Sequence, residues 1–306
     1  MSSTGSHLEH VRRLAERATA HDGTAPFDEA VLLQLERDGL PEQLSSVDQH
    51  AAAWVTHDEH GGADLHLVVD PDVRGEGVGS ARTAILLDEV TATVRAWSHG
   101  DHPAARALAE RHHFARARAL WVMRRGIEHL PSLADLRESP GVRLRHLGSE
   151  ESAGGPTRED DRDAVLTINA AAFADHPEQG ALDVDGFEQR ADSDWFDPRG
   201  LLLAVEEESG EVLGFHWTKL DPGAGNDGEI PGEIYVLGIA PAAQGRGLGT
   251  LLSLAGLHHM VDAGASELLL YVEGDNAAAI RTYEKLGFTH ADLDTHVQYV
   301  REARGS

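Results

Sequence analysis

The chain has 306 residues, of which 52 are acidic and 26 are lysine or arginine, so its formal net charge is −26. A hydrophobic fraction of 41 % is too high for a disordered acidic segment, and this length is typical of two domains. There is no cysteine, which excludes a disulfide framework, a thiolate nucleophile and a cysteine zinc site. The acidity disfavours nucleic acid or anionic lipid as a partner and also fits adaptation to high internal salt.

The N-terminal segment, residues 1–18, is polar and lacks the apolar centre of a signal peptide. The longest apolar runs, such as ELLLYV at residues 267–272, have the length of a strand rather than of a membrane span. These features predict a cytoplasmic protein without a membrane segment.

The first half alternates strands with helices. LVVDPDVRGEGVGS, residues 67–80, predicts a strand, a turn and a glycine loop, followed by a helix over 79–90. A strand at 91–98 and a helix at 103–112 come next, and ALWVMRR at 119–125 predicts the last strand of this half.

The second half begins with a predicted strand, VRLRHL, at residues 142–147. The polar stretch 148–163 has linker composition, but it follows that strand and is predicted to be an internal loop before a helix. A helix at 249–261, a strand at 267–272 and a helix at 276–285 complete the pattern.

The two halves are copies of one unit. Residues 237–250 match 67–80 without a gap at an offset of 170, and residues 274–288 lie over 100–114 at an offset of 174. Conserved order and spacing indicate a duplicated mixed α/β fold.

The boundary between the copies is expected near Pro140. The predicted domains are therefore residues 1–140 and 141–306.

Each copy carries a glycine-rich turn between a strand and a helix. In QGRGLG, Gln244 to Gly249, the glycines permit positive φ, and the helix start offers free N–H groups to a phosphate. No Lys-Ser or Lys-Thr follows, so this is not a P-loop, and the spacing does not match the dinucleotide fingerprint. Two such loops in register favour pyrophosphate binding.

These loops resemble the acetyl-CoA signature of the Gcn5-related N-acetyltransferases, which reads Gln or Arg, two residues, Gly, any residue, then Gly or Ala. The matching residues are Gln244, Gly247 and Gly249 in the second copy and Arg74, Gly77 and Gly79 in the first. A companion signature is matched by Asn276, Tyr283 and the turn Leu286-Gly287-Phe288.

The resemblance implies tandem acetyltransferase domains, each a strongly curved mixed sheet flanked by helices and splayed beside the glycine loop. It implies acetyl-CoA as the donor, held mainly by backbone groups, with no metal. The residues expected to bind it are Leu67, Val68, Val69, Gly75, Glu76, Gly77, Val78, Gly79, Ser80, Leu237, Gly238, Ile239, Gln244, Gly245, Arg246, Gly247, Leu248, Gly249, Thr250, Asn276, Ala277, Ala278, Ala279, Ile280 and Arg281.

Acetyl transfer to an amine needs a base, an oxyanion donor and an acid for the leaving thiolate. Glu233, four residues before Leu237, is the carboxylate best placed at the strand edge to act as the base, although a solvated glutamate would look the same. The resemblance puts the oxyanion donor at the Leu237 or Gly238 N–H and the acid at Tyr283. An aromatic at that helical position could equally be a core residue.

Segments 173–180, 195–204, 214–219 and 232–249 resemble tandem members of the family that acetylate the cysteinyl amine of Cys-GlcN-Ins. The substrate contacts that the resemblance implies are Glu29, Glu178, Lys219, Glu233 and Tyr271. By residue type alone, each of these could also be a surface or core side chain.

The copies differ at the catalytic positions. Counting back by the two offsets, Glu233 corresponds to Ala63, Tyr283 to Ala109 and Asn276 to His102, whereas the loop glycines persist. The first copy is therefore expected to bind acetyl-CoA without turning it over.

Nineteen histidines raise the question of a metal. The pairs in HDEH (57–60), HGDH (99–102), 112–113 and 258–259 have no zinc-protease spacing, so solvent-exposed histidines and no metal are expected. The expected enzyme is a monomer. Two alternatives remain open: a tandem acetyltransferase for a polyamine, an aminoglycoside or a protein N-terminus, and an acetyl-CoA-binding regulator without turnover.

Overall fold

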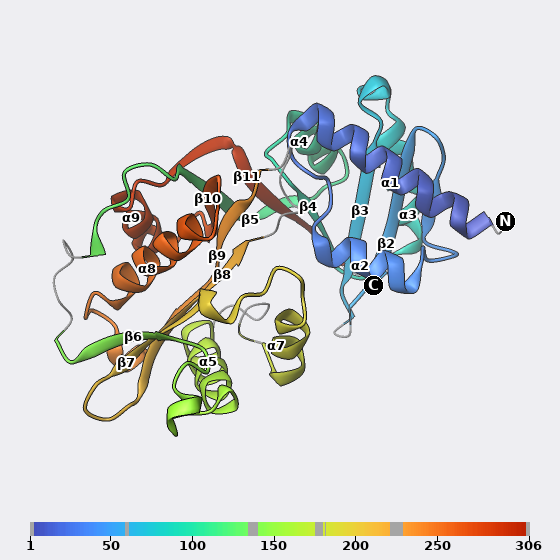
Figure 1. The fold of residues 1–306 in the computed structure, drawn as a ribbon. Coiled ribbons are helices and arrows are strands. Elements are labelled where there is room, and N and C mark those ends of the chain that lie inside the picture. Colours follow the sequence, from blue (N-terminus) through green and yellow to red (C-terminus); the bar gives the residue numbers. More distant parts are fainter. Residues whose placement is uncertain are drawn as a thin grey trace. The chain divides into compact units, whose positions relative to one another are not determined.

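The structure is a computed structural model that describes residues 3–58, 61–133, 140–174, 180, 182–220 and 229–303 (Figure 1). The chain divides into two compact units. The first unit comprises Met1–Val122, Glu273–Asp275 and His290–Ser306, and the second comprises Met123–Val272 and Asn276–Thr289.

The first unit is built on a sheet with helices on both faces. Its elements are α1 (Ser3–Asp22), α2 (Glu29–Asp38), β1 (Ser45–Val47), β2 (Ala51–His57), β3 (Ala63–Val69), the 3-10 turn η1 (Pro71–Val73), α3 (Val78–Glu89), β4 (Val94–Ser98), α4 (Pro103–Arg111), most of β5 (Ala115–Gly126) and nearly all of β11 (Thr289–Arg301). The strands run in the order β1-β2-β3-β4-β11-β5. β3 and β4 are parallel, whereas the pairs β1–β2, β2–β3 and β4–β11 are antiparallel.

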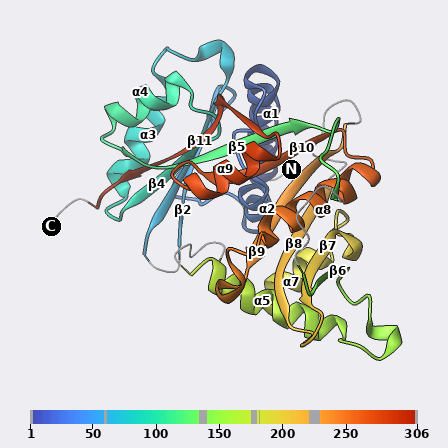
Figure 2. The same ribbon diagram turned by 90° about the vertical axis from the view of Figure 1, so that its left-hand side faces the viewer.

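The two faces of this sheet have separate cores. Trp54 of β2 packs with Val11 and Leu14 of α1 on one face, and Val55 of the same strand packs with Leu86 of α3 on the other. Neighbouring residues of a strand point to opposite faces, so one strand serves both cores. Figure 2 shows α1 and α2 on one side and α3 and α4 on the other.

The second unit repeats this plan. Its elements are β6 (Val142–His146), η3 (Glu151–Ala153), α5 (Arg158–Ala172), α7 (Val184–Ala191), η4 (Pro198–Gly200), β7 (Leu201–Glu206), β8 (Val212–Leu220), β9 (Pro231–Ile239), η5 (Pro241–Ala243), α8 (Leu248–Asp262), β10 (Glu267–Glu273) and α9 (Ala277–Lys285). The strands run in the order β6-β7-β8-β9-β10, with β9 and β10 parallel.

The faces of the second sheet are covered by different helices (Figure 1). Phe215 and Trp217 of β8 pack with Val165 of α5 and Phe187 of α7. His216, which alternates with them, lies on the α8 face and reaches the Leu252 carbonyl.

The predicted helices after the two glycine loops agree with α3 and α8 to within one residue. The prediction of a loop over residues 148–163 is wrong for its last part, because α5 begins at Arg158. Thr157 accepts from the Asp160 N–H and the Asp160 carboxylate accepts from the Thr157 N–H, which is a capping box. β4 begins at Val94 rather than at residue 91.

The end of the chain returns to the first unit. β11 pairs antiparallel with β4 from Val297 opposite Ser98 to Arg301 opposite Val94. Val297 is fully buried and Tyr299 nearly so. The division into units therefore differs from a single boundary at residue 140: the first unit ends at Val122 and also contains residues 273–275 and 290–306.

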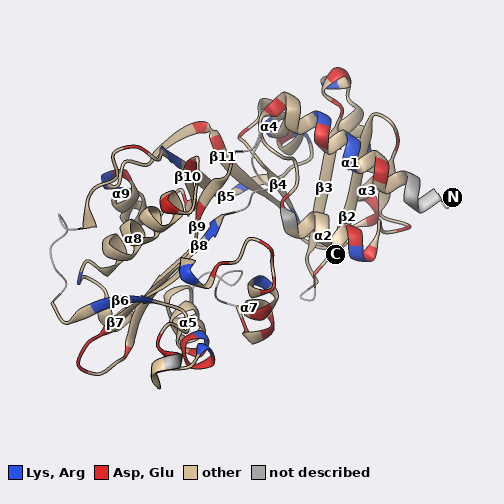
Figure 3. Ribbon diagram, in the orientation of Figure 1, with Lys and Arg blue, Asp and Glu red and all other residues tan. Residues whose placement is uncertain are grey.

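Charged side chains of both signs lie along the elements of both units, with acidic residues in excess (Figure 3). One of the charged pairs is buried: Arg145 of β6 and Asp161 of α5 form an ion pair at 2.5 Å. No helix in the described ranges is long and apolar enough to cross a membrane.

Candidate functional site

The glycine loop of the second unit follows β9 directly. After η5, Gly245 and Gly247 both have a φ of +80°, a conformation that other residues rarely adopt. Gly247 is the N-cap of α8 and has no side chain to bond the first N–H groups of the helix. These groups and the helix dipole are therefore available to an anion. Arg246 is paired with Glu206 at 2.9 Å.

β9 separates from β10 just before this loop. The two strands pair from Pro231 opposite Glu267 to Ile234 opposite Leu270 and no further. The register between β8 and β9 shifts at the same point, since Trp217 faces Val236 and Thr218 faces Ile234. Tyr235 is thus an extra residue in β9, and such a bulge bends a strand.

The separation exposes one edge of β9. Leu237, Gly238 and Ile239 pair with β8 on one side, whereas the register with β10 has already ended. Backbone groups on the open side can pair with an extended ligand, as an added strand would.

Three of the predicted substrate residues lie on one face of the second sheet. Lys219 of β8 faces Glu233 of β9 directly, and Glu233 faces Leu269 of β10. Tyr271 is two residues beyond Leu269 and so points the same way, with 42 % of its surface exposed. The register therefore brings Lys219, Glu233 and Tyr271 together on the α5 and α7 face.

Aromatic side chains surround Lys219 on this face. Its Nζ lies 5.1 Å from the Trp195 ring centre and 5.9 Å from that of Tyr235. Arg190 of α7 donates to the Tyr235 hydroxyl at 2.8 Å. Trp195, Tyr235 and Arg190 were not predicted as site residues, and the only signal for Tyr235 in the sequence is its position two residues after Glu233.

Tyr283 is on the inner side of α9. It is 8 % exposed and contacts the edge of Phe288, with 6.0 Å between ring centres. Burial raises the pKa of Tyr283 to about 12. The phenol therefore stays protonated at neutral pH, as a proton donor must.

Asn276 has a structural role that the motif did not reveal. It is the N-cap of α9, and its side-chain oxygen accepts from the Ala279 N–H at 3.1 Å. Ala277, Ala278 and Arg281 are exposed, whereas Ile280 is buried. Leu248 is also buried, so Leu248 and Ile280 can offer only backbone groups to a cofactor.

The first unit has the same loop conformation. Gly75 and Gly77 have φ values of +83° and +87°, and Gly77 is the N-cap of α3 without a capping side chain. β3 and β4 pair only at Ala63 and Asp64 and then separate. Both loops thus sit beside an opened pair of parallel strands.

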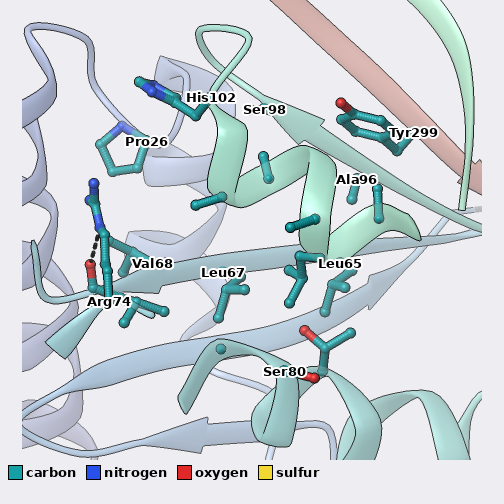
Figure 4. Close-up of a pocket in the computed structure, with 18 of the residues that line it drawn as sticks. Pro26, Leu65, Leu67, Val68, Arg74, Ser80, Ala96, Ser98, His102 and Tyr299 are labelled. Carbon is teal, nitrogen blue, oxygen red and sulfur yellow. Dashed lines mark hydrogen bonds between the residues drawn. The ribbon is translucent and has the colours of Figure 1, made fainter. Parts of the chain in front are cut away.

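A pocket of about 390 Å³ fills the opening in the first unit. It is lined by the predicted residues of β3 and of the loop, including Leu67, Gly77 and Ser80. Arg74 lies at one end, where it bonds the Asp22 carboxylate at 2.7 and 2.9 Å. Figure 4 shows Arg74 at this end and Leu65, Ala96 and Tyr299 towards the other.

The strand registers correct one expected correspondence. Asp64 faces Thr56 on β2 and Arg95 on β4, and Glu233 faces Lys219 and Leu269 on the matching strands. Asp64, not Ala63, is therefore the counterpart of Glu233. The offset of 170 fails here because β3 has no residue equivalent to the bulged Tyr235.

Ala109 is buried in α4, 7 % exposed, at the same place in its helix as Tyr283 in α9. His102 is the N-cap of α4 but makes no side-chain capping bond, unlike Asn276. The first unit thus retains a carboxylate at the base position and has no phenol at the acid position.

The other predicted substrate residues are less informative. Glu29 is the first residue of α2 and belongs to the first unit. Glu178 lies outside the described residues.

The expectation of exposed histidines is wrong for most of the motif pairs. His57 and His113 are exposed, but His99, His102, His112, His258 and His259 are half-buried. Among the described residues no group of three His, Asp or Glu could hold a metal ion.

The opened strands, the glycine loop and the helix after it lie within residues 164–288, which match a model of the acetyltransferase (GNAT) family. A Gcn5-related N-acetyltransferase structure from Sphaerobacter thermophilus aligns with a TM-score of 0.67 and 21 % identity over 98 % of this chain and 94 % of that one. A tandem GNAT protein from the clavulanic acid biosynthesis pathway aligns with a TM-score of 0.63 and 18 % identity over 99 % of this chain and 97 % of that one. These structures confirm the predicted fold class.

Curated relatives narrow the class. Mycothiol acetyltransferase from Nocardioides sp. strain JS614 is 50 % identical over 96 % of this chain and 97 % of its own. Mycothiol acetyltransferase from Mycolicibacterium smegmatis is 40 % identical over 95 % of each chain. The chain belongs to the family of mycothiol acetyltransferases.

Proposed function

We propose that the second unit transfers the acetyl group of acetyl-CoA to the cysteinyl amine of Cys-GlcN-Ins, which gives mycothiol. The observation that carries the proposal is the placing of Lys219, Glu233 and Tyr271 on one face of the sheet, next to the point where β9 leaves β10. Polar groups from three adjacent strands suit an acceptor rich in hydroxyl groups.

The donor binds through backbone groups. The N–H groups from Gln244 to Thr250 hold the pyrophosphate, since Gly247 leaves the start of α8 uncapped. The open edge of Leu237 to Ile239 pairs with the pantetheine arm. Asn276 contributes at the start of α9, and Arg281 is exposed on the same helix.

The reaction is a direct transfer. Glu233 removes a proton from the substrate ammonium, directly or through water, and the amine nitrogen attacks the thioester carbon. An N–H of Leu237 or Gly238 stabilises the oxyanion. The C–S bond then breaks, and Tyr283 gives its proton to the departing thiolate. The nitrogen loses its second proton as the amide forms, and this proton restores the Tyr283 phenol.

Recognition of the acceptor uses charge and hydrogen bonds. Lys219, Glu233 and Tyr271 contact the cysteinyl and sugar groups. Lys219 keeps its ammonium group against Trp195 and Tyr235, which restricts its rotamers.

We propose that the first unit binds acetyl-CoA without transferring the acetyl group. Its loop has the same backbone conformation as the second, and a pocket follows it. Asp64 stands at the base position but is held by Arg95, and Ala109 replaces the acid. The enzyme is a cytoplasmic monomer, and sedimentation of the purified chain would test its oligomeric state.

The test is a comparison of acceptors. The purified chain is incubated with acetyl-CoA and Cys-GlcN-Ins, a polyamine, an aminoglycoside or a peptide with a free N-terminus, and the released thiol and acetylated product are measured. Acetylation of Cys-GlcN-Ins far above the others is expected. Preference for another amine, or no turnover with any of them, would contradict the proposal.

A further inference from the structure

One end of the pocket in the first unit is lined by apolar side chains. Beyond the last paired residues of β3 and β4, it is lined by Leu65, Ala96, Ala109, Phe114 and Tyr299. Leu65, Ala109 and Tyr299 are each less than 9 % exposed. A ligand whose phosphates lie at the glycine loop would direct its far end towards these side chains (Figure 4).

At two matching positions this end has smaller side chains than the second unit. Val94 of β4 and Leu268 of β10 occupy matching positions in the two units. Ala96 therefore corresponds to Leu270. Ala109 likewise corresponds to Tyr283, because each is the seventh residue of its helix, α4 or α9. Two alanines therefore stand where the second unit has a leucine and a tyrosine, and both changes remove apolar volume.

The small side chain of Ala96 matters because of its neighbour. Ala96 faces Tyr299 of β11 directly, and Val297 and Tyr299 pack with Ala109 and Phe114. This part of the wall is thus built from α4, the residue Phe114 that follows it and β11. A pocket end lined by packed apolar side chains favours an apolar occupant.

We propose that the first unit selects a CoA thioester with an apolar acyl chain longer than acetyl, the chain lying between Ala96, Ala109 and Tyr299. This inference rests on the proposed binding of CoA phosphates by the first glycine loop. Acetyl-CoA fits the same site but leaves its end unfilled. Each added methylene buries apolar surface that would otherwise face water.

The test uses the full chain with Gly247→Asp, which blocks the second loop, and calorimetric titration with CoA, acetyl-CoA, butyryl-CoA and succinyl-CoA. Each buried methylene strengthens binding about fourfold, so butyryl-CoA is expected to bind about fifteenfold tighter than acetyl-CoA. Adding Gly77→Asp must abolish the signal. Ala109→Leu should remove the preference for butyryl-CoA, whereas Ala81→Leu, on the exposed side of α3, should keep it.

The outcomes separate the two proposals. If none of the four ligands binds to the folded Gly247→Asp chain, CoA binding by the first unit is refuted and this inference with it. If CoA and acetyl-CoA bind but butyryl-CoA binds no tighter, only the inference about the acyl chain fails. Tighter binding of succinyl-CoA than of butyryl-CoA would also overturn it, because the occupant would then be charged.

Discussion

Asp64 and Glu233 occupy the same place in the two copies of the fold, and Asp64 is held there by an arginine. Arg95 donates to both oxygens of the Asp64 carboxylate, at 2.9 and 2.8 Å, and also to Asp58 at 2.6 Å. The residue that matches Arg95 in the second unit is Leu269, which cannot form an ion pair. Arg95 in place of Leu269 is therefore a chemical difference between the two copies at this position.

Glu233→Gln should lower kcat by about 100-fold or more, because the loss of a general base typically costs 10²–10⁴ in rate. The amide keeps the size of the side chain but cannot take a proton. The measurement is kcat against pH for both proteins, and the acidic limb should vanish in the variant. Glu211→Gln, in the exposed turn before β8, is the matched control. An unchanged rate and pH profile would remove Glu233 from the mechanism.

Tyr283→Phe should have a smaller effect, about tenfold, because a CoA thiolate resembles a cysteine thiolate of pKa about 8.5 and can leave partly unaided. The pKa of Tyr283 of about 12 keeps the phenol protonated across the working range. The rate of the native enzyme should therefore show no alkaline loss from this group below pH 10. A loss as large as that of Glu233→Gln would mean that protonation of the thiolate limits the reaction.

His216 should make the second unit sensitive to acid. It is fully buried, its Nδ1 lies 2.8 Å from the Leu252 carbonyl, and its Nε2 has no protein partner in the described structure. Burial lowers the pKa of His216 to about 4. Protonation of His216 is therefore unfavourable in the folded state. The contribution of neutral His216 to the free energy of unfolding is complete above pH 6.5 and is lost as the pH falls towards 4.

The size of that loss is about 3 kcal/mol, from a pKa difference of about 2.5 units. Chemical denaturation of the native chain and of His216→Gln at a series of pH values would measure it, since glutamine keeps a donor but cannot become charged. The variant should lose less stability between pH 6.5 and 4. His57→Gln, at an exposed position, should follow the native curve. Parallel curves for all three proteins would contradict the assignment.

Local elements were predictable because they are marked locally. Proline and glycine delimit the helices after both loops, and an apolar run marks β10. The start of α5 was also readable, since Thr157 and Asp160 have the spacing of a capping box. The pairing of strands that lie far apart in the sequence was not predictable. No pattern in residues 290–301 says that β11 joins β4, some 200 residues earlier in the chain.

The candidate site shows the same division. Lys219, Glu233 and Tyr271 were named from the sequence, and the strand register explains how they share a face. The bulge at Tyr235 could not be predicted from one sequence, because it depends on pairing with β8. A fixed offset ignores this extra residue and therefore gives Ala63 as the counterpart of Glu233. The packing of Trp195 on Lys219 likewise exists only in three dimensions.

Removal of residues 290–306 should unfold part of the first unit. β4 would lose its antiparallel partner, and the buried Val297 and Tyr299 contribute about 2 kcal/mol each through burial. The shortened chain should bind one CoA equivalent fewer and be cut by protease within residues 94–126. A control that lacks only residues 302–306 keeps β11 and should behave as the full chain. Retention of both CoA equivalents after the longer deletion would show that β11 is dispensable.

The two glycine loops should be separable by mutation. Gly77 and Gly247 have φ values of +87° and +80°, so Gly77→Asp and Gly247→Asp each strain the loop and add a negative charge where phosphates bind. Each variant should lose one of two CoA equivalents in equilibrium dialysis. Acetyl transfer should disappear in Gly247→Asp alone, because the first unit lacks a phenol at Ala109 and holds Asp64 in an ion pair.

The control for the loop variants is Gly210→Asp, which also replaces a glycine of positive φ, at +75°, but in the exposed turn between β7 and β8. It should keep both CoA equivalents and full transfer, which would show that strain and charge act only at the loops. Abolished transfer in a folded Gly77→Asp chain would mean that chemistry in the second unit depends on a ligand in the first. That result would assign the first unit a part in catalysis rather than binding alone.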